Sequence, residues 1–487
     1  MRIVFATSEV SPIAKTGGLG DVCGSLPKAL AALDHDVTVF MPFYRQAREW
    51  FERNDVQPEQ ITPAIRIDWA NWSAEATYFR TVLPGSEVPL ILAANDFFFD
   101  RDQIYTGYGG VDDFLQRYTF FCRAVISGCE LLNIAPEVLH AHDWHTALLP
   151  VYLHSGLRGS EQFRKTRSVY TIHNLNYQGV ADPPAFSLTG LHPRYWAADA
   201  LEHFGKVNPM KGGIIFADQV TTVSPNYARE IETPELGAGL DGVLRSVAYK
   251  FSGILNGIDV DEWDPASDTH LDANYEPGKL HGKAISKRML AKEAGLKSKP
   301  RTPMLAVVSR LVEQKGLQLL TPILGKLLRA GAQAVILGSG DRPYEEAFER
   351  VAEQHRDSCR VWIGFDNSLA HRIYAGADLL LMPSAYEPCG LNQMYALRYG
   401  TVPVVRLTGG LADTVIPFDG TNRAEANGFG FRHMSTDELY LATWAGMLNH
   451  KDSRTWKILQ QNGMEQDFSW TRSARAYEDV YRRAAGA

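Results

Sequence analysis

The sequence predicts an α/β protein built from two doubly wound, Rossmann-like domains in tandem. Short apolar runs that suit buried strands alternate with longer stretches of helical spacing, which predicts parallel sheets covered by helices on both faces. This alternation starts again in the second half of the chain. The 487 residues are too many for one ordinary core and suit two domains of roughly 200 to 250 residues. In such sheets, ligands bind at the carboxyl ends of the strands.

The expected elements follow from hydrophobic periodicity. In the first half we expect a long helix over 114–132 and strands at 3–6, 36–41, 168–172 and 219–223. In the second half we expect helices between strands at 304–308, 334–337, 361–363, 379–382 and 402–405. The last stretch, 470–483, has helical spacing with Tyr477, Val480 and Tyr481 on one face.

A domain boundary is expected near Asn256 and Gly257. The apolar residues 253–255 precede it, and a polar stretch with proline and glycine, 264–278, follows it. This change of composition suits a hinge. The predicted division is therefore a first domain over 1–255, a second over 256–467 and a final helical segment over 468–487.

Composition excludes several classes of partner. A formal charge of −7 gives no basic field for nucleic acid. No apolar stretch approaches the ~20 residues needed to span a bilayer, and the first apolar run is too short for a signal-peptide core. The five cysteines are scattered without C-x-x-C spacing, so we expect free thiols and no structural zinc. We expect a cytoplasmic protein with neither nucleic acid nor membrane as a partner.

The chain is organised around the glycine-rich segment Lys15-Thr16-Gly17-Gly18-Leu19-Gly20-Asp21, which follows the first apolar run. Glycines let the backbone approach a ligand closely, and a following helix directs N–H groups and its positive dipole end into the same space. Lys15 adds a mobile charge, so the segment suits a phosphate group. On the glycines alone, an ordinary tight turn remains an equal alternative. The pattern is neither the dinucleotide fingerprint nor the nucleotide triphosphatase loop.

Two polar clusters resemble metal sites without completing one. The segment His140-Ala141-His142-Asp143-Trp144-His145 has metal-ligating residue types, but its spacing differs from the H-x-H-x-D-H of metal hydrolases. We expect these histidines to be structural. Asp259 and Asp261 have D-x-D spacing, yet they lie in the expected hinge, where a solvated acidic loop is favoured. The sequence therefore predicts no metal.

The second half supplies cations and a carboxylate at strand ends. Arg310 and Lys315 follow the strand 304–308, and two such cations neutralise a diphosphate without metal. Glu387-Pro388-Cys389-Gly390-Leu391 follows the strand 379–382, where Pro388 and Gly390 shape a turn that presents Glu387. No histidine lies beside Cys389 in sequence, so a nucleophilic role for this thiol is not expected.

Taken in order, these segments resemble the motifs of the bacterial glycogen and plant starch synthases. The resemblance implies two domains facing across a deep cleft, the GT-B architecture, with the terminal helix crossing back to the first domain. It implies retaining transfer of glucose from ADP-glucose to the non-reducing end of an α-1,4-glucan such as glycogen or a maltooligosaccharide. The matching positions are Lys15 to Asp21, His140 to His145, His173-Asn174, Asn256-Gly257, Arg310 to Gly316, Glu387 to Leu391 and Gly409 to Val415.

The resemblance also assigns roles. Lys15, Arg310 and Lys315 would stabilise the departing diphosphate. His173 and Glu387 would hold the glucosyl unit, and Asp143 would act near the sugar and acceptor. The implied donor-binding set is Lys15, Gly18, Asp21, Asn256, Arg310, Lys315, Phe365, Cys389, Gly390 and Leu391.

Three further expectations concern the donor and the reaction. Phe365 follows Gly364 at a strand end and is expected to stack on the adenine. Asn392 stands where many relatives carry threonine, which leaves the donor contact of that side chain open. No pair of carboxylates resembles a glycosidase site, which favours front-face transfer, with the diphosphate taking the acceptor's proton and no essential metal or other cofactor.

Other functions remain open on sequence alone. One is a related retaining glycosyltransferase that uses UDP-glucose or a small acceptor. Another is a catalytically idle regulator that binds glucan or nucleotide. A dinucleotide oxidoreductase is disfavoured because the G-x-G-x-x-G fingerprint is missing.

Overall fold

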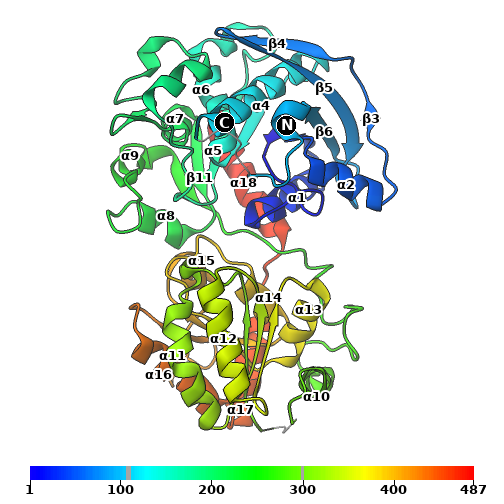
Figure 1. Ribbon diagram of the computed structural model, residues 1–487, viewed down its shortest axis with the longest axis vertical. Helices are drawn as coiled ribbons and strands as arrows, with labels where there is room; N and C mark the ends of the chain where they lie inside the picture. The colour runs from blue at the N-terminus through cyan, green and yellow to red at the C-terminus, as the bar shows by residue number, and fades with distance from the viewer. Residues whose placement is uncertain (106–110, 298–300, 487) are drawn as a thin grey trace. The chain divides into compact units, whose positions relative to one another are not determined.

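The computed structural model describes residues 1–105, 111–297 and 301–486. The chain divides into two compact units, one of residues 1–257 with 470–487 and one of residues 258–469, which we call unit 1 and unit 2. In each unit, helices pack on both sides of a central sheet (Figure 1). Among the described residues, no helix combines the length and the apolar character needed to cross a membrane.

Ten of the described strands of unit 1 form one sheet in the order β12-β11-β8-β7-β1-β2-β6-β5-β3, with β4 paired to β5. Pairing is parallel from β12 to β6 and antiparallel beyond it. The chain moves outward from β1 to β2 and β6 on one side, and from β7 to β8, β11 and β12 on the other. The point where the strand order reverses therefore lies between β1 and β7. The strands are β1 Arg2–Ala6, β2 Asp36–Pro42, β3 Glu59–Gln60, β4 Ile65–Trp69, β5 Trp72–Val82, β6 Pro89–Ala94, β7 Val138–His142, β8 Arg167–Ile172, β11 Gln219–Thr222 and β12 Phe251–Gly253, with a separate hairpin of β9 Glu202–His203 and β10 Lys206–Val207.

The last helix of the chain packs in unit 1, beside α1 and the strands β7, β8 and β11. The hydroxyl of Tyr481 lies 2.9 Å from Nδ1 of His140, which joins the end of the chain to β7. The helices of this unit are α1 Gly18–Ala31, α2 Arg45–Arg53, α3 Asp96–Phe99, α4 Val111–Leu131, α5 Asp143–Thr146, α6 Leu148–Ser155, α7 Pro209–Phe216, α8 Pro225–Ile231, α9 Asp241–Ser246 and α18 Trp470–Ala485.

The described strands of unit 2 form an all-parallel sheet in the order β15-β14-β13-β16-β17-β18. Here the strand order reverses between β13 and β16. The strands are β13 Met304–Val308, β14 Gln333–Gly338, β15 Cys359–Ile363, β16 Leu379–Met382, β17 Val402–Arg406 and β18 Phe429–Phe431. The helices are α10 His281–Glu293, α11 Leu317–Arg329, α12 Arg342–Gln354, α13 Asn367–Gly376, α14 Asn392–Arg398, α15 Gly409–Thr414, α16 Thr436–Asn449 and α17 Ser453–Met464.

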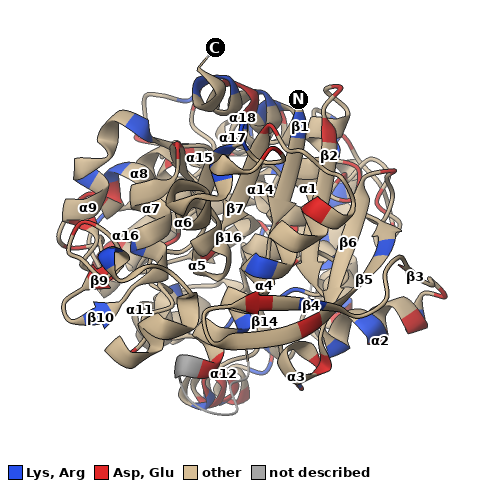
Figure 2. Cartoon of the chain, turned by 90° about the horizontal axis from the view of Figure 1, so that it is seen from above, with Lys and Arg blue, Asp and Glu red and all other residues tan. Residues whose placement is uncertain are grey.

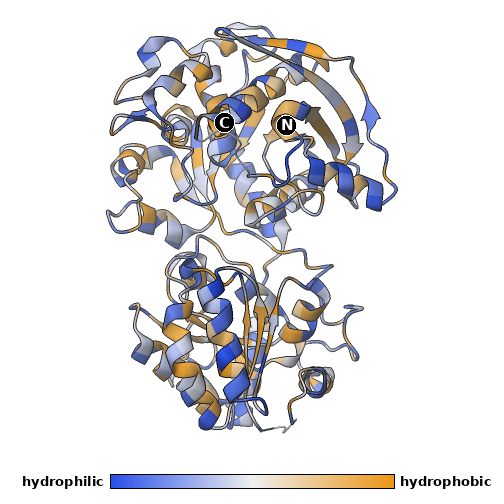
Figure 3. Cartoon of the chain, in the orientation of Figure 1, coloured by the Kyte–Doolittle hydropathy of each residue, from blue (hydrophilic) through white to orange (hydrophobic). Residues whose placement is uncertain are grey.

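Hydrophobic burial explains why these residues form these elements. Every residue of β14 and β16 is buried, as expected for strands covered on both faces. In α11, Leu317, Leu320, Leu324 and Leu327 recur at helical spacing and are buried against the sheet. Each such side chain contributes about 1.5 to 3 kcal/mol. Figure 3 shows the hydrophobic colour concentrated in the central strands, whereas Figure 2 shows both signs of charge dispersed over the chain.

The predicted fold class is confirmed, since each unit contains a doubly wound sheet, all parallel in unit 2 and mainly parallel in unit 1. The observed bounds differ from the expected ones by a few residues, as in β8 and α4. The expected strands did not include the antiparallel pair β4 and β5, the parallel strands β6 and β12 or the edge strand β18. Only some residues of β5 are buried, so its apolar pattern is weaker than that of a core strand.

Candidate active site

In unit 1, three of the predicted segments lie at one edge of the sheet. The glycine-rich segment follows β1, Asp143 follows β7 and His173 follows β8. These three strands are neighbours and parallel, so their carboxyl ends share an edge. The first two segments flank the reversal point between β1 and β7, where open α/β sheets bind their ligands.

The glycine-rich loop is held by a carboxylate that sequence analysis missed. Glu9 is only 3% exposed, and its carboxylate accepts hydrogen bonds from the backbone N–H groups of Thr16 at 2.6 Å and Gly17 at 3.1 Å. It also accepts from the hydroxyls of Thr16 and Tyr105. The N–H groups of Thr16 and Gly17 are therefore engaged within the protein.

Part of this loop borders open space. A Cβ atom added at Gly17 or Gly18 would meet nothing within 4 Å, so both residues border open space. At Gly20 an added Cβ would lie 2.6 Å from Cβ of Lys15, so glycine is needed there for α1 to start against the loop. Nζ of Lys15 lies 2.6 Å from Oδ1 of Asp21, and the Lys15 side chain is 39% exposed.

Asp143 and His173 are brought together at the ends of β7 and β8. Oδ1 of Asp143 accepts a hydrogen bond from the N–H of His173 at 2.7 Å and a longer one from that of Asn174 at 3.4 Å. The backbone of Asp143 has φ of 54°, an unusual value for a residue other than glycine and one often found at functional sites. Burial raises the pKa of the Asp143 carboxyl to about 7, although these backbone hydrogen bonds oppose the shift.

The histidines of this region are buried and uncharged at neutral pH. Burial lowers the pKa of His173 to about 3 and holds the pKa values of His140, His142 and His145 well below 6.5. Nε2 of His173 lies 3.0 Å from Nδ1 of His142, and Nε2 of His140 lies 2.7 Å from Oγ1 of Thr171. Among residues 1–105, 111–297 and 301–486, no group of three or more His, Cys, Asp or Glu side chains has an arrangement suited to a metal ion.

In unit 2, Lys315 and Glu387 form a nearly buried ion pair. Nζ of Lys315 lies 2.6 Å from Oε2 of Glu387, and the two side chains are 16% and 9% exposed. The hydroxyl of Ser384 donates to the same oxygen at 3.0 Å. These residues come from the loops after β13 and β16, which flank the reversal point of this sheet. Arg310 is exposed on the first of these loops, where its Nη2 reaches Oε1 of Gln314 at 3.4 Å.

Glycines allow the loops around Glu387 to pack closely. An added Cβ at Gly316, which has φ of 66°, would lie 1.8 Å from the carbonyl oxygen of Pro383. At Gly409 an added Cβ would lie 1.9 Å from the carbonyl oxygen of Glu387, and the N–H of Gly410 donates to that oxygen. The start of the segment Gly409 to Val415 therefore packs against the backbone of the Glu387 turn and forms a hydrogen bond with it.

The rest of that turn is also ordered. Cys389 is buried, and its carbonyl and that of Gly390 accept hydrogen bonds from Nε2 of Gln393. Leu391 is partly buried just before α14. Nδ2 of Asn392 donates to the carbonyl of Val308 at 2.5 Å, so this amide ties α14 to the end of β13.

Three other predicted residues have different surroundings. Phe365 follows the end of β15 and is 85% exposed. Asn256 is buried in unit 1, and its Oδ1 accepts no hydrogen bond from the described residues. Oδ1 of Asp259 accepts from the N–H groups of Asp261 and Glu262, so it closes a turn of its own chain.

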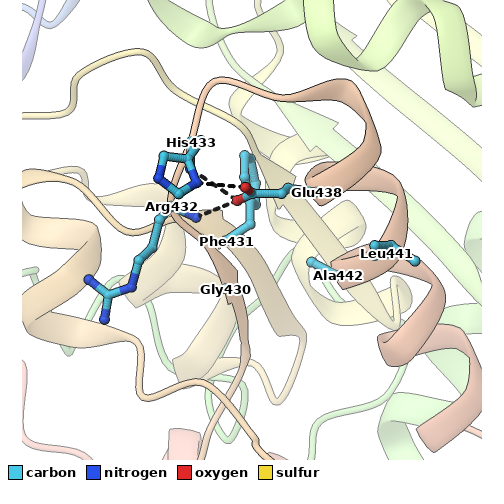
Figure 4. Close-up of a pocket in the computed structure, with 7 residues that line it drawn as sticks. All are labelled: Gly430, Phe431, Arg432, His433, Glu438, Leu441 and Ala442. Atoms are coloured by element: carbon cyan, nitrogen blue, oxygen red, sulfur yellow. Dashed lines mark hydrogen bonds and ion pairs between the residues drawn. The ribbon is translucent and has the colours of Figure 1, made fainter.

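A separate hollow of about 310 Å³ in unit 2 contains none of the predicted site residues. It is formed by β18 and α16, and Figure 4 shows the Glu438 carboxylate pointing to the His433 ring while the Arg432 guanidinium points away. Glu438 accepts from the N–H groups of Arg432 and His433, each at 3.0 Å, and from the His433 ring at 2.6 Å. Its seven lining residues are Gly430, Phe431, Arg432, His433, Glu438, Leu441 and Ala442.

Sequence analysis missed the residues that hold the site residues in place. Besides Glu9, these include Ser384 and Arg406, whose guanidinium donates to the carbonyls of Ser384 and Ala385. Each is a single polar residue that belongs to no recognisable motif. No local pattern marks such a residue.

The family models match both halves of the chain. The model described as "Starch synthase catalytic domain" matches residues 2–246, and the model described as "Glycosyl transferases group 1" matches residues 291–438. Together they cover most of both units.

The similarity to known proteins extends over almost the whole chain. Glycogen synthase of Thermotoga maritima is 42% identical, with 99% of each chain covered, and that of an Anaeromyxobacter strain is 44% identical, with both chains fully covered. The catalytic domain of starch synthase IV from Arabidopsis thaliana, solved with ADP and acarbose, is 34% identical with a TM-score of 0.90, covering 100% of this chain and 99% of that one. Sucrose-phosphate synthase of Thermosynechococcus elongatus shares the fold, with a TM-score of 0.60 and 16% sequence identity. The comparison covers 99% of this chain and 98% of that one. The chain belongs to the glycogen and starch synthase family and is a glycosyltransferase.

Proposed function

We propose that this chain transfers glucose from ADP-glucose to the non-reducing end of an α-1,4-glucan, with retention of configuration. Family membership supports glucan synthesis. The Arabidopsis relative was solved with ADP and acarbose, a nucleoside diphosphate and an oligosaccharide analogue. These ligands support a nucleotide-sugar donor and a glucan acceptor for this chain.

The observation that carries the proposal is the Lys315 and Glu387 pair at the reversal point of the unit 2 sheet. A carboxylate held by an ammonium group and the Ser384 hydroxyl is fixed before substrate arrives, which is what electrostatic stabilisation of a transition state requires. We assign Glu387 to the glucosyl unit. Lys315 and the exposed Arg310 are assigned to the diphosphate.

In unit 1, we assign Lys15 to the diphosphate and the open backbone at Gly18 to close approach of the donor. His173 is neutral at physiological pH, so its ring serves as a hydrogen-bonding group for the glucosyl hydroxyls and adds no positive charge. Asp143 holds the backbone of His173 and is assigned to the sugar and acceptor.

The proposed reaction is a front-face transfer. The bond between the anomeric carbon and the diphosphate oxygen breaks while a bond to the acceptor hydroxyl oxygen forms. The proton of that hydroxyl passes to the departing diphosphate. Lys15, Arg310 and Lys315 would supply the countercharge, so we propose that no metal is essential. Dialysis against a chelator should leave activity largely intact, and complete loss restored by one divalent cation would refute this part.

We further propose that adenine stacks on Phe365 and that donor binding uses Asp21, Asn256 and the turn from Cys389 to Leu391. The exposed ring of Phe365 at a strand end supports the stacking role. The buried Oδ1 of Asn256, which accepts no hydrogen bond from the described residues, supports a polar contact to a ligand. A cytoplasmic location is also proposed, since all five cysteines are free thiols.

The decisive experiment measures kcat/KM for glucan extension with ADP-glucose and with UDP-glucose, using glycogen as the acceptor. We expect a clear preference for ADP-glucose, and Phe365→Ala should reduce that preference. Equal or better turnover with UDP-glucose would overturn the donor assignment. No extension with either donor would overturn the proposed reaction.

A further inference from the structure

Unit 1 contains a second hollow, whose lining includes none of the residues assigned to catalysis. Its volume is about 310 Å³, near the lower end of the range for small-molecule sites. We call it the Arg123 pocket. Its lining includes Arg123 from α4, Tyr152 and Ser155 from α6, and Gly190, His192 and Tyr195 from the segment that follows β8.

Arg123 carries a charge that no carboxylate neutralises. The centre of its guanidinium lies 3.8 Å from the centre of the Tyr152 ring, and the group also lies beside the Tyr152 hydroxyl. Among the residues that the structure describes, none forms an ion pair with Arg123, and its buried Nε donates no hydrogen bond. By contrast, Arg117 on the same helix pairs with Asp113 at 2.9 Å.

Further positively charged side chains lie near the pocket. Arg194 lies beside Tyr195, with its Nη2 3.1 Å from the Tyr195 hydroxyl. His154 lies 3.1 Å from the same hydroxyl, and burial followed by the charges of Arg158 and Arg194 lowers its pKa. The nearby carboxylate of Asp218 is already paired with Arg158. The pocket therefore favours an anion.

The backbone leaves room for such a ligand. Gly190 has φ of 65°, and an added Cβ there would lie 3.2 Å from Nη2 of Arg123, so a side chain would crowd the guanidinium. In the hollow at β18 and α16, by contrast, the carboxylate of Glu438 pairs with the His433 ring (Figure 4). The two hollows also differ in their arginines, because Arg123 is partly buried with a buried, unpartnered Nε, whereas Arg432 is exposed to solvent.

We propose that the Arg123 pocket binds a small phosphate-bearing molecule, with the Arg123 guanidinium as its anion contact. Guanidinium groups bind phosphate oxygens through two parallel hydrogen bonds, and such bonds are strongest in partly desolvated sites. The remaining volume, beside the Tyr195 and Ser155 side chains, accommodates a polar ring such as that of a sugar. The ligand is either free phosphate or a phosphorylated sugar, which share this anion chemistry.

This site is distinct from the residues assigned to the transfer reaction. Asp143 precedes α6, whereas Ser155 is its last residue, and a helix of eight residues spans about 12 Å. The proposal therefore does not rest on the assigned donor or acceptor. Its ligand should bind together with the nucleotide.

The test is isothermal titration calorimetry of the full chain with inorganic phosphate and, separately, with glucose 1-phosphate, both without ADP and with saturating ADP. Saturable binding of either probe is expected. Arg123→Gln should weaken it at least 10-fold. His192→Glu places a carboxylate on an exposed rim residue and should weaken it at least threefold, and a glutamate oxygen can also accept the Arg194 N–H that the His192 ring now accepts. Arg66→Gln, an exposed arginine of the same unit, is the matched control and should bind like the parent chain.

The two probes distinguish the possible sources of the anion. Equal affinity for both would assign the pocket to free phosphate, and tighter binding of glucose 1-phosphate would assign it to a phosphorylated sugar. The proposal is overturned if neither probe binds saturably, if ADP abolishes binding, or if neither Arg123→Gln nor His192→Glu weakens it. Circular dichroism of Arg123→Gln excludes unfolding as the cause of a loss.

Discussion

Glu387 is the residue whose charge matters most to the proposed transition state. The Lys315 ammonium and the Ser384 hydroxyl both contact its Oε2, so the side chain is fixed before the donor arrives. Glu387→Gln keeps the shape and an accepting oxygen but removes the charge. We expect kcat to fall by about 10²-fold or more, the scale of one preorganised contact. The measurement is glucan extension under saturating donor.

The matched control is Glu346→Gln, which removes an exposed carboxylate of the same unit that pairs with Arg342. Its kcat should equal that of the parent chain. A near-normal kcat for Glu387→Gln would remove the Glu387 charge from the mechanism.

Asp143 should make stability depend on pH. Its folded-state pKa of about 7 lies above the ordinary value of 3.8 because the carboxyl is buried. The folded state therefore binds more protons than the unfolded state between these values, and the contribution of Asp143 to stability falls as pH rises from about 4 to about 7. Asp143→Asn removes this titration. We expect the unfolding free energy of the parent chain, relative to Asp143→Asn, to decrease by about 2 to 3 kcal/mol between pH 5 and pH 8.

Urea unfolding of both proteins at the two pH values gives this difference directly. Asp68→Asn, an exposed carboxylate that pairs with Arg66, is the control and should give no pH-dependent difference. If Asp143→Asn behaves like this control, then the Asp143 carboxyl is ionised throughout the range.

Of the two carboxylates Glu9 and Glu387, only Glu387 could be predicted from the sequence as a site residue. Glu387 stands within a turn whose residue types and position after a strand indicate a site. Glu9 stands alone before the glycine-rich loop, and nothing local shows that its carboxylate binds Thr16 and Gly17. Its role arises from the way the loop folds back on the end of β1, which is a tertiary effect.

At the scale of elements, Gly316 lets the loop after β13 pack against the loop after β16. Alanine at this position would place Cβ 1.8 Å from the Pro383 carbonyl oxygen, and the backbone has φ of 66°. The two loops carry Lys315 and Glu387. We expect Gly316→Ala to lower the unfolding free energy by more than about 2 kcal/mol, because the left-handed backbone alone costs about 1 to 2 kcal/mol. Activity should fall as well, since the ion pair is displaced.

Gly295→Ala separates the clash from the backbone effect. Gly295 has φ of 71°, and an added Cβ there would meet nothing within 4 Å. Chemical denaturation should show a loss of about 1 to 2 kcal/mol for this variant, with normal activity. Equal losses for both glycine variants would mean that the loops after β13 and β16 adapt without cost.

The elements themselves were predictable to different degrees. Core strands such as β13 and β16 are continuous apolar runs, so their sequence bounds match the structure. The pair β4 and β5 was missed because a strand that is only partly covered needs few apolar residues. Its antiparallel pairing onto β6 depends on contacts between segments that no local pattern records.

At the scale of the whole chain, unit 1 is assembled from both ends of the sequence. The final helix α18 buries Trp470, Tyr477 and Tyr481 in this unit, although residues 258–469 of unit 2 separate them from the rest of it. The stability of unit 1 therefore depends on residues that the chain supplies last. The helical spacing of 470–483 predicted a helix with one apolar face, but only the resemblance indicated which domain that face covers.

Tyr481→Ala tests this dependence. Loss of a buried aromatic ring costs about 3 to 5 kcal/mol, and the variant also leaves Nδ1 of His140 without its hydroxyl partner. Hydrogen exchange measured by mass spectrometry should become faster in β7 and β8, while peptides of unit 2 keep the rates of the parent chain. Arg475→Ala changes an exposed residue of the same helix and should leave both units unaffected. Faster exchange spread evenly over both units would instead mean that the chain unfolds as one cooperative body. Unchanged exchange rates in β7 and β8 would mean that α18 contributes little to the stability of unit 1.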